Sequence, residues 1–424
     1  MFYDELLSSE EKELQREVLQ FVRDEVPPEL LKQMDRDEIK WPREYVRKLG
    51  ERNLLGLRFD PQWGGRGLPW TAEMAAGEEI AILNNVCTCA FMMPSMVGQA
   101  IHLFGTDEQK ERFLRPMLRG TLQAAECLTE PRGGSDFFGA TTKAVLDGEH
   151  FVVNGQKRFV VAAEVADIFL VYCRTNFEDT DPKNRVSALI IERGPGIETE
   201  YLYGLMGNRG GGAARIVFRD VRVPRENLIG ELHGGFQVFN QMMFPERMAC
   251  VMGALGSARA ALDIAARYSA KRNAFGKPIR EFQAISFMVG DAITQLDAAR
   301  GLTYLAAKAI DNGSSSARRL VSEAKKFSTE AAWDVVSKAM QIMGGIGYTD
   351  VFPIERILRD VRLTMIFTGT NEVMNLMIQH EFYRELLHGR DDERDAEKDA
   401  HAYGDEDEKC FTDEDMWRVH ERKD

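Results

Sequence analysis

The ten residues Cys127-Leu128-Thr129-Glu130-Pro131-Arg132-Gly133-Gly134-Ser135-Asp136 divide this 424-residue chain into two kinds of sequence. Before them, apolar residues recur at helical spacing, and Ser8 and Glu11 have the spacing of a capping box that starts the first helix. Further helical patterns cover residues 45–54, 74–83 and 108–118. The pattern predicts an N-terminal helical domain over residues 1–120.

After the ten-residue stretch, the sequence predicts a β domain over residues 121–232. Its apolar runs are short and rich in β-branched residues, as is typical of strands. They cover residues 151–153, 168–173, 186–191 and 216–223. The dipeptides Asp147-Gly148 and Asn154-Gly155 are typical of tight turns between antiparallel strands, so we expect a hairpin at each.

Beyond Gly234 the sequence returns to long helical patterns rich in Ala, Leu and Met. Three of them, over residues 246–268, 282–310 and 317–343, are long enough to form a helical bundle. We therefore expect an α+β fold in which a C-terminal four-helix bundle covers residues 233–390. No GxGxxG motif follows a strand pattern, so a Rossmann domain is not expected.

The formal net charge of −13 argues against nucleic acid as the main partner, because phosphate binding needs a basic surface. Residues 391–424 carry 15 acidic and 6 basic side chains, so this acidic tail accounts for −9 of that charge. It is either a solvated tail or a docking segment. The N-terminus is acidic and polar, and the six cysteines lack the spacing of disulfides or a metal site. We expect a cytoplasmic protein without a membrane span or a bound metal.

The order of the three domains and the ten-residue stretch together resemble the acyl-CoA dehydrogenase family, over the chain from the first helix to about Leu387. The resemblance implies that the middle domain is a β-barrel or sandwich. Taken alone, the glycine-rich stretch is equally consistent with a plain turn. The resemblance implies FAD as the cofactor, with Leu128 and Thr129 at the pyrimidine edge of the flavin and Ser135 near the pyrophosphate and CoA. Two flavin positions depart from the family pattern, since Phe159 replaces the usual Trp and Val161 replaces a Thr that bonds flavin N5.

Two further segments resemble the parts of the family that hold the rest of FAD. Residues 272–278 are similar to a turn that binds the diphosphate, and residues 341–348 are similar to a signature that binds the adenosine half from the neighbouring subunit. The resemblance therefore implies a homo-oligomer, most often a tetramer. A glycine pair after a helix is also a common helix C-cap. The implied cofactor residues are Arg272, Phe275, Phe282, Gln283, Gln341, Gly344 and Gly345.

The expected catalytic base has moved. Many family members carry it in a Tyr-Glu-Gly-Thr segment, where this chain has Phe367-Thr368-Gly369-Thr370. A second class, the long-chain and isovaleryl type, carries it before an Arg on a bundle helix, where this chain has Glu246-Arg247. The exchange predicts that Glu246 takes the α-proton of an acyl-CoA thioester. The alternative is that Glu246 is an acidic residue in the first turn of a helix after Pro245, favoured by the helix dipole.

By resemblance, the backbone N–H of Thr368 bonds the thioester carbonyl. Thr370 and Glu372 are expected to contact FAD, and Ser135, Phe244, Arg247 and Gly369 the substrate. The implied reaction forms a 2-enoyl-CoA, with the β-hydride accepted at flavin N5 and the electrons passed to an electron-transferring flavoprotein. The rival readings are an oxidase or monooxygenase on the same fold, and a scaffold without activity.

The acyl group is expected to lie beside residues 84–99, whose apolar members suit an alkyl, branched or aromatic chain. An Arg for a second carboxylate is missing there, with Cys87 at about that position. The apolar members are Phe91, Met92, Met93 and Met96.

Overall fold

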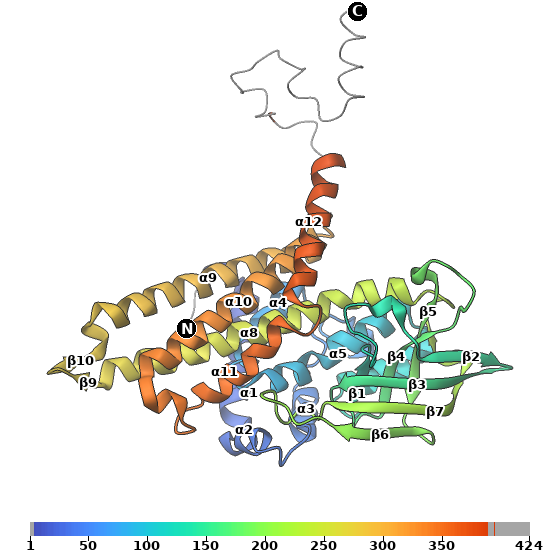
Figure 1. The fold of residues 1–424 in the computed structure, drawn as a ribbon, viewed down its shortest axis with the longest axis horizontal. Coiled ribbons are helices and arrows are strands. Elements are labelled where there is room, and N and C mark those ends of the chain that lie inside the picture. The colour runs from blue at the N-terminus through green and yellow to red at the C-terminus, as the bar shows by residue number, and fades with distance from the viewer. Residues whose placement is uncertain (1–3, 389–393, 395–424) are drawn as a thin grey trace, which may run out of the picture. The chain divides into compact units, whose positions relative to one another are not determined.

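One long helix, α8 (Gly235–Lys271), runs from the β domain through the whole C-terminal bundle (Figure 1). The computed structural model describes residues 4–388 and 394. These residues divide into a first unit that ends at Gln379 and a second unit that begins at His380. The described part of the second unit consists of the last residues of α12 (Asn371–His388) and Arg394, and the acidic tail otherwise lies outside the described residues.

The N-terminal part of the first unit is helical, as predicted. The predicted capping box is present, because Ser8 Oγ accepts from the Glu11 N–H at 3.2 Å and the Glu11 carboxylate accepts from the Ser8 N–H at 2.8 Å. The helices are α1 (Ser9–Glu25), α2 (Pro28–Asp35), α3 (Arg43–Glu51), α4 (Trp70–Ile80), α5 (Asn85–Phe104), α6 (Asp107–Gln109), a π-helical turn (Lys110–Leu114) and α7 (Arg115–Leu118).

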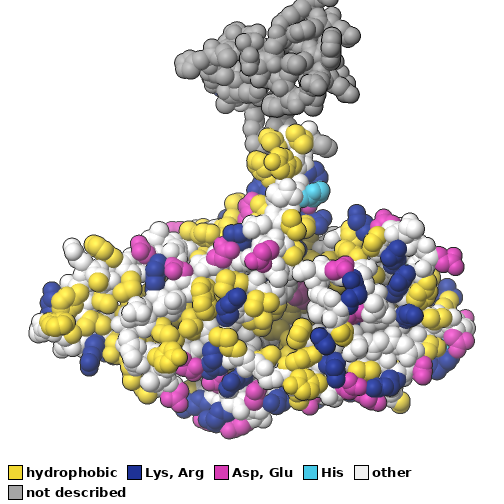
Figure 2. Space-filling model, viewed as in Figure 1, with side chains coloured by type: hydrophobic (Ala, Val, Ile, Leu, Met, Phe, Trp, Pro, Cys, Tyr) yellow, Lys and Arg dark blue, Asp and Glu magenta, His cyan; other side chains and the backbone are white. Residues whose placement is uncertain are grey.

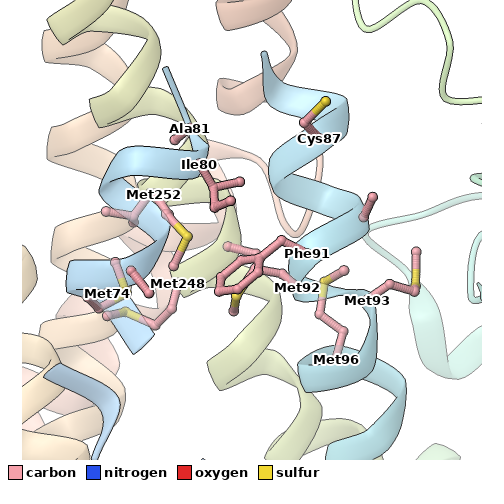
Figure 3. Packing of buried hydrophobic residues seen from close by; sticks show 14 of the residues in the cluster. Met74, Ile80, Ala81, Cys87, Phe91, Met92, Met93, Met96, Met248 and Met252 are labelled. Atoms are coloured by element: carbon pink, nitrogen blue, oxygen red, sulfur yellow. The ribbon is translucent and has the colours of Figure 1, made fainter. Parts of the chain in front are cut away.

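Helix α5 carried no helix prediction of its own, because it is apolar almost throughout and shows no amphipathic period. It lies in the interior, and Asn84 caps its N-terminus by accepting from the Cys87 N–H at 2.7 Å. Figure 3 shows the side chains of Phe91, Met92 and Met96 on α5 packed toward α4 and α8. The expected acyl-lining side chains are therefore part of the buried core.

The middle of the first unit is an eight-stranded sheet in which β6-β7-β3-β2-β4-β5-β8 are neighbours and β1 pairs in parallel with β4. The Asp147-Gly148 turn joins β2 to β3 as predicted. The hairpin predicted at Asn154-Gly155 is wrong, because both residues lie within β3 at a register shift against β7. The strands are β1 (Ala124–Cys127), β2 (Lys143–Asp147), β3 (His150–Val160), β4 (Ile168–Arg174), β5 (Val186–Glu192), β6 (Ile197–Leu202), β7 (Ala214–Pro224) and β8 (Leu228–Ile229).

The C-terminal part is a bundle in which α10 (Ala317–Met343) packs between α8 and α9 (Gln283–Asp311) (Figure 1). Helix α10 has the predicted bounds, whereas α8 begins at Gly235 and not at Glu246. The short hairpin β9–β10 (Asn273–Ala274 and Lys277–Pro278) links α8 to α9, and α11 (Ile354–Arg362) precedes α12. The predicted α+β class, with helical domains on either side of a β domain, is confirmed.

Two helices, α5 and α8, are long and apolar enough to cross a membrane by length and composition. In each, 78% of the apolar window is buried inside the protein. Helices that form the core of a water-soluble domain pass the same test, so this finding gives little support for a membrane span.

Candidate active site

One face of α8 contacts both the β domain and the segment that precedes α12. Met242, Glu246 and Cys250 are spaced four residues apart, so their side chains lie on the same side of the helix. The Tyr172 hydroxyl of β4 donates to Met242 Sδ at 2.8 Å, and the Cys250 thiol donates to the Thr364 carbonyl at 3.2 Å. Glu246 lies between these two contacts. Because Pro245 and Glu246 are inside the helix, the alternative that placed Glu246 in a first helical turn is wrong.

The Glu246 side chain is buried, with 8% of the residue exposed. Its carboxyl group is in hydrogen-bond contact with the carboxyl group of Glu126 on β1. Burial raises the pKa of Glu126 well above its ordinary value, and the adjacent Glu246 raises this pKa further. Burial also raises the pKa of Glu246, while the hydrogen bond from Glu126 opposes that rise. The site therefore contains a half-buried carboxyl group, Glu126, beside a buried one, Glu246, and their contact favours a single proton on the pair.

The turn Thr368-Gly369-Thr370 faces the same side of α8 as Glu246. The Cys250 thiol, one helical turn after Glu246, donates to the Thr364 carbonyl four residues before Thr368, and the Thr368 hydroxyl is buried without a hydrogen-bond partner among the described residues. Thr368 and Gly369 both have positive φ, at 54° and 87°. The buried Lys325 of α10 holds this conformation by donating to the Gly369 carbonyl at 2.8 Å and to Asn371 Oδ1 at 2.9 Å.

A second buried lysine holds the glycine-rich loop at residues 127–136. Lys157 is fully buried, and its ammonium donates to Glu130 Oε1 at 2.9 Å, to the Tyr172 carbonyl at 2.8 Å and to the Leu128 carbonyl at 3.1 Å. Thr141 donates to the Glu130 carboxylate through its N–H and its hydroxyl, both at 2.6 Å. These bonds fix the backbone beside Leu128 and Thr129.

The remaining predicted flavin residues surround this loop. Arg158 donates its N–H to the Thr129 carbonyl at 2.7 Å, which ties the loop to β3. Phe159 has a positive φ of 58° and its side chain is 55% exposed, with its ring 4.8 Å from that of Tyr203. Val161 is half-buried and Ser135 is exposed. An exposed aromatic face beside a glycine-rich loop fits the implied flavin ring.

The residues predicted for the other half of FAD lie at the far end of α8. A cavity of about 1110 Å³ is lined there by Arg272, Gly344 and Gly345, among others, and Gln341 lies one turn before Gly345. A Cβ atom at either glycine would meet open space, so these positions leave room for a ligand. Phe282 packs against Phe275, with ring centres 6.0 Å apart, and Gln283 begins α9. The arrangement fits the implied cofactor.

The structure separates these two halves of the predicted cofactor site within one chain. Glu246 and Lys271 are 25 residues apart on α8, which corresponds to roughly 37 Å at 1.5 Å per residue. The residues predicted for the two halves of FAD therefore lie far apart within one chain.

The side chains of the predicted substrate residues Phe244 and Arg247 point to different parts of the protein. Phe244 is half-buried against the core, while the buried Arg247 points toward α10 and donates to Ser322 Oγ at 3.1 Å. Burial lowers the pKa of Arg247 to about 10, and the nearby Arg318 contributes to the shift. Glu372 is exposed in the first turn of α12, next to Thr370. Thus Arg247 and Glu246 are adjacent in sequence but contact different residues.

Sequence reasoning missed three residues of this site: the half-buried Glu126, the buried Lys157 as a support for the loop, and the buried Lys325. Lys157 is flanked by Gln156 and Arg158, and Lys325 is followed by Lys326, so the sequence gives no signal that either charge is buried. Glu126 precedes the glycine-rich loop and carried no such signal, because its importance depends on Glu246.

The sequence of this chain matches the models of one protein family and several curated proteins. Three family models match: "Acyl-CoA dehydrogenase, N-terminal domain" at residues 8–121, "Acyl-CoA dehydrogenase, middle domain" at 125–221 and "Acyl-CoA dehydrogenase, C-terminal domain" at 233–382. Similar curated proteins are a 3-(aryl)acrylate reductase of Clostridium sporogenes (34% identical, covering 87% of this chain and 98% of the relative) and a short-chain specific acyl-CoA dehydrogenase of Clostridium acetobutylicum (34%, 89% and 99%). Another is the caffeyl-CoA reductase-Etf complex subunit CarC of Acetobacterium woodii (32%, 88% and 97%).

Solved structures give the same result. Butyryl-CoA dehydrogenase from Megasphaera elsdenii has a TM-score of 0.84 and 32% identity, with 91% of this chain and 100% of that chain covered. A chain from work on the electron transferring flavoprotein of Acidaminococcus fermentans has a TM-score of 0.85 and 33% identity, with 90% and 100% covered. The "FAD complex of PigA" has a TM-score of 0.83 and 25% identity, with 90% and 99% covered.

Proposed function

Because this chain belongs to the acyl-CoA dehydrogenase family, a family of FAD-binding oxidoreductases, we propose that it oxidises an acyl-CoA thioester to the 2-enoyl-CoA with Glu246 as the base. The observation that carries the proposal is the position of Glu246. Its buried carboxyl lies on the face of α8 that, through Cys250, also contacts Thr364 in the segment leading to Thr368. Bound FAD supplies a hydride acceptor at N5.

The chemistry assigned to the chain is removal of the α-proton. The Cα–H bond breaks and the proton passes to the Glu246 carboxylate, while the pair of electrons left at Cα forms the double bond as the β-hydride leaves. The α-proton is acidic only when the thioester carbonyl is polarised, and we assign that polarisation to the Thr368 N–H. A carboxylate buried away from water is a stronger base than an exposed one, which matches the burial of Glu246.

Replacing Thr368 by Ala tests whether the backbone or the side chain is required. The N–H remains in Thr368→Ala, so flavin reduction should slow by less than about tenfold, well short of the roughly 10²- to 10³-fold cost of losing an oxyanion donor. The measurement is the rate of flavin bleaching after anaerobic mixing with acyl-CoA. A loss of 10²-fold or more would assign the role to the hydroxyl and reject the backbone assignment.

We also propose that FAD is bound between two copies of the chain, since the two halves of the site are too far apart in one copy. The bundle end near the adenosine cavity exposes large apolar side chains, which fits a subunit interface. Figure 2 shows hydrophobic side chains at the left tip of this view, where Figure 1 places the β9–β10 hairpin. The exposed fractions are 95% for Phe275, 63% for Phe287, 79% for Tyr348 and 66% for Val351. A tetramer is the expected assembly.

Arg272→Ala should weaken FAD binding about 10- to 100-fold, because a hydrogen bond to a charged group contributes roughly 1.5–3 kcal/mol. Arg280→Ala is the matched control, since Arg280 is exposed in the same connection between α8 and α9 but does not line the cavity. The Kd is measured by titrating apoprotein with FAD. Equal affinity in the two variants would remove Arg272 from the cofactor site.

The first experiment on the proposed function is an anaerobic titration of the holoenzyme with straight, branched, aromatic and dicarboxylic acyl-CoAs. Bleaching by one class would establish the reaction and identify the acyl group. If no thioester bleaches the flavin but reduced flavin reacts rapidly with oxygen, the oxidase reading replaces this one. We further propose an electron-transferring flavoprotein as the electron acceptor, in keeping with the related CarC and its named Etf complex. The cytoplasm is proposed as the compartment.

A further inference from the structure

Glu126 is placed at the site by the alternation of strand β1. Ala125 and Cys127 point into the core of the sheet domain, so Ala124, Glu126 and Leu128 face the helical side. Leu128 is one of the residues expected at the flavin, and Glu126 lies two positions before it on the same face. The strand therefore directs a carboxyl group toward α8.

The Glu126 carboxyl has a single polar partner among the described residues. Its Oε1 atom is shielded from solvent and accepts no hydrogen bond from an ordinary donor in that part of the chain. Its carboxyl contact is Glu246. Two carboxylates repel each other and neither carries a hydrogen to donate, so a contact of this kind is stable when one member is protonated.

We propose that Glu126 is a positioning residue for the base: it stays protonated in the resting enzyme and donates its O–H to the Glu246 carboxylate, so that the pair holds one proton and one negative charge. The proposal rests on the proposed function of Glu246. One carboxylate oxygen of Glu246 accepts this hydrogen bond, and the other stays available for the substrate. The hydrogen bond from Glu126 in the β domain fixes the orientation of the Glu246 carboxylate. When the Cα–H bond breaks, the proton goes to Glu246 and the pair becomes neutral.

The other titratable groups around the pair are uncharged at neutral pH. Cys89 faces it from α5, Tyr172 from β4, Cys250 from α8, and Cys127 is the next residue on β1. Burial raises the pKa of Cys89 to about 12 and that of Cys250 to about 11, and it raises the pKa values of Cys127 and Tyr172 well above their ordinary ranges. Within the described residues, the negative charge of the pair is therefore not matched by a cation that faces it.

The direction of the effect follows from the roles in the pair. A donated hydrogen bond stabilises the charged form of Glu246 and lowers its pKa. Glu126→Met removes that donor and keeps the burial, so the acid limb of the rate profile should move up by about one to two pH units. Glu126→Gln replaces the O–H by an amide N–H, which also donates, so its acid limb should stay close to the wild-type position.

The experiment measures the rate constant of flavin reduction by acyl-CoA against pH in the holoenzyme and both variants. An upward shift in Glu126→Met that Glu126→Gln rescues supports the proposal. An unmoved limb in Glu126→Met overturns it, because a role in packing alone lowers the rate equally at every pH. A downward shift in both variants also overturns it, since that result requires an ionised Glu126 in the wild type.

Infrared spectroscopy of the holoenzyme without substrate provides a readout that needs neither turnover nor the Met variant. The wild type should show the carbonyl band of a protonated carboxylic acid at neutral pH, Glu246→Gln should retain a band of this kind, and Glu126→Gln should lose it. A band that survives in Glu126→Gln, or is missing from the wild type, refutes the pair. If no acyl-CoA reduces the flavin, the proposed function fails while the infrared result still decides the protonation of Glu126.

Discussion

Glu246→Gln is expected to slow flavin reduction by acyl-CoA about 10²- to 10⁴-fold, the usual contribution of a general base. The amide has the same shape as the carboxyl group but cannot accept the α-proton. It still occupies the buried position on α8 between the contacts of Met242 with Tyr172 and of Cys250 with Thr364, so FAD content and acyl-CoA binding should be preserved. The measurement is anaerobic stopped-flow bleaching of the flavin, with acyl-CoA affinity taken from the spectral shift on binding.

Asp263→Asn is the matched control, because it also converts an acid to an amide on α8 but at a position paired with the exposed Arg267. Its rate should equal that of the wild type. Retained bleaching in Glu246→Gln would show that another group takes the proton and would reject the assigned base. Loss of FAD from the variant would instead indicate a structural role for Glu246.

Lys157→Met is expected to lower the free energy of unfolding by about 3–5 kcal/mol, the cost of leaving one member of a buried ion pair without its partner. Lys157 is fully buried, and Glu130 is 4% exposed. The substitution would also remove the bonds that the Lys157 ammonium donates to the Leu128 carbonyl in the loop at residues 127–136 and to the Tyr172 carbonyl on β4. Urea unfolding of the holoenzyme, followed by tryptophan and flavin fluorescence, measures the change.

The control for this variant is a surface pair of the same type. Lys326→Met breaks the pair with Glu330 on the exposed side of α10 and should cost about 0–1 kcal/mol. Adding Glu130→Gln to Lys157→Met should recover part of the loss, because the uncompensated charge is removed. If Lys157→Met and Lys326→Met cost the same, the buried network does not stabilise the loop as proposed.

The Glu130 carboxylate also gives this network a pH dependence. Burial by itself would raise the pKa of Glu130, but the Lys157 ammonium and the Thr141 donors outweigh burial and bring the pKa from its ordinary value of 4.5 to about 2. A carboxyl whose folded pKa is lowered contributes stability above its unfolded pKa and loses it as the pH falls toward the folded pKa. The wild type should therefore lose this contribution between about pH 4.5 and 2, and Lys157→Met should lack that dependence.

Local pattern was sufficient where a property depends on neighbours along the chain. The capping box at Ser8 and the bounds of α10 follow from short-range spacing, and both are present in the structure. The start of α8 was misplaced because Pro245 was taken as a helix start, yet tertiary packing accommodates this proline within the helix. The hairpin at Asn154-Gly155 was predicted wrongly because this dipeptide occurs both in turns and in bulges. Here Asn154 lies within β3 and exchanges hydrogen bonds with Asp220 on β7.

The sequence by itself determined the family and the order of helical and β domains. It also determined that Thr368 occupies one base position of the family while Glu246 occupies the other, since these features can be read from residues near one another in the chain. Only the tertiary structure brought Glu126 to Glu246, set Lys157 under the loop and Lys325 under the Thr368 turn, and separated Arg272 from the flavin end of the site. These pairings join residues far apart in the chain. Burial and the contact between the two carboxyl groups then favour a single proton on the pair, because the energy of a charge depends on the solvent and the charges around it.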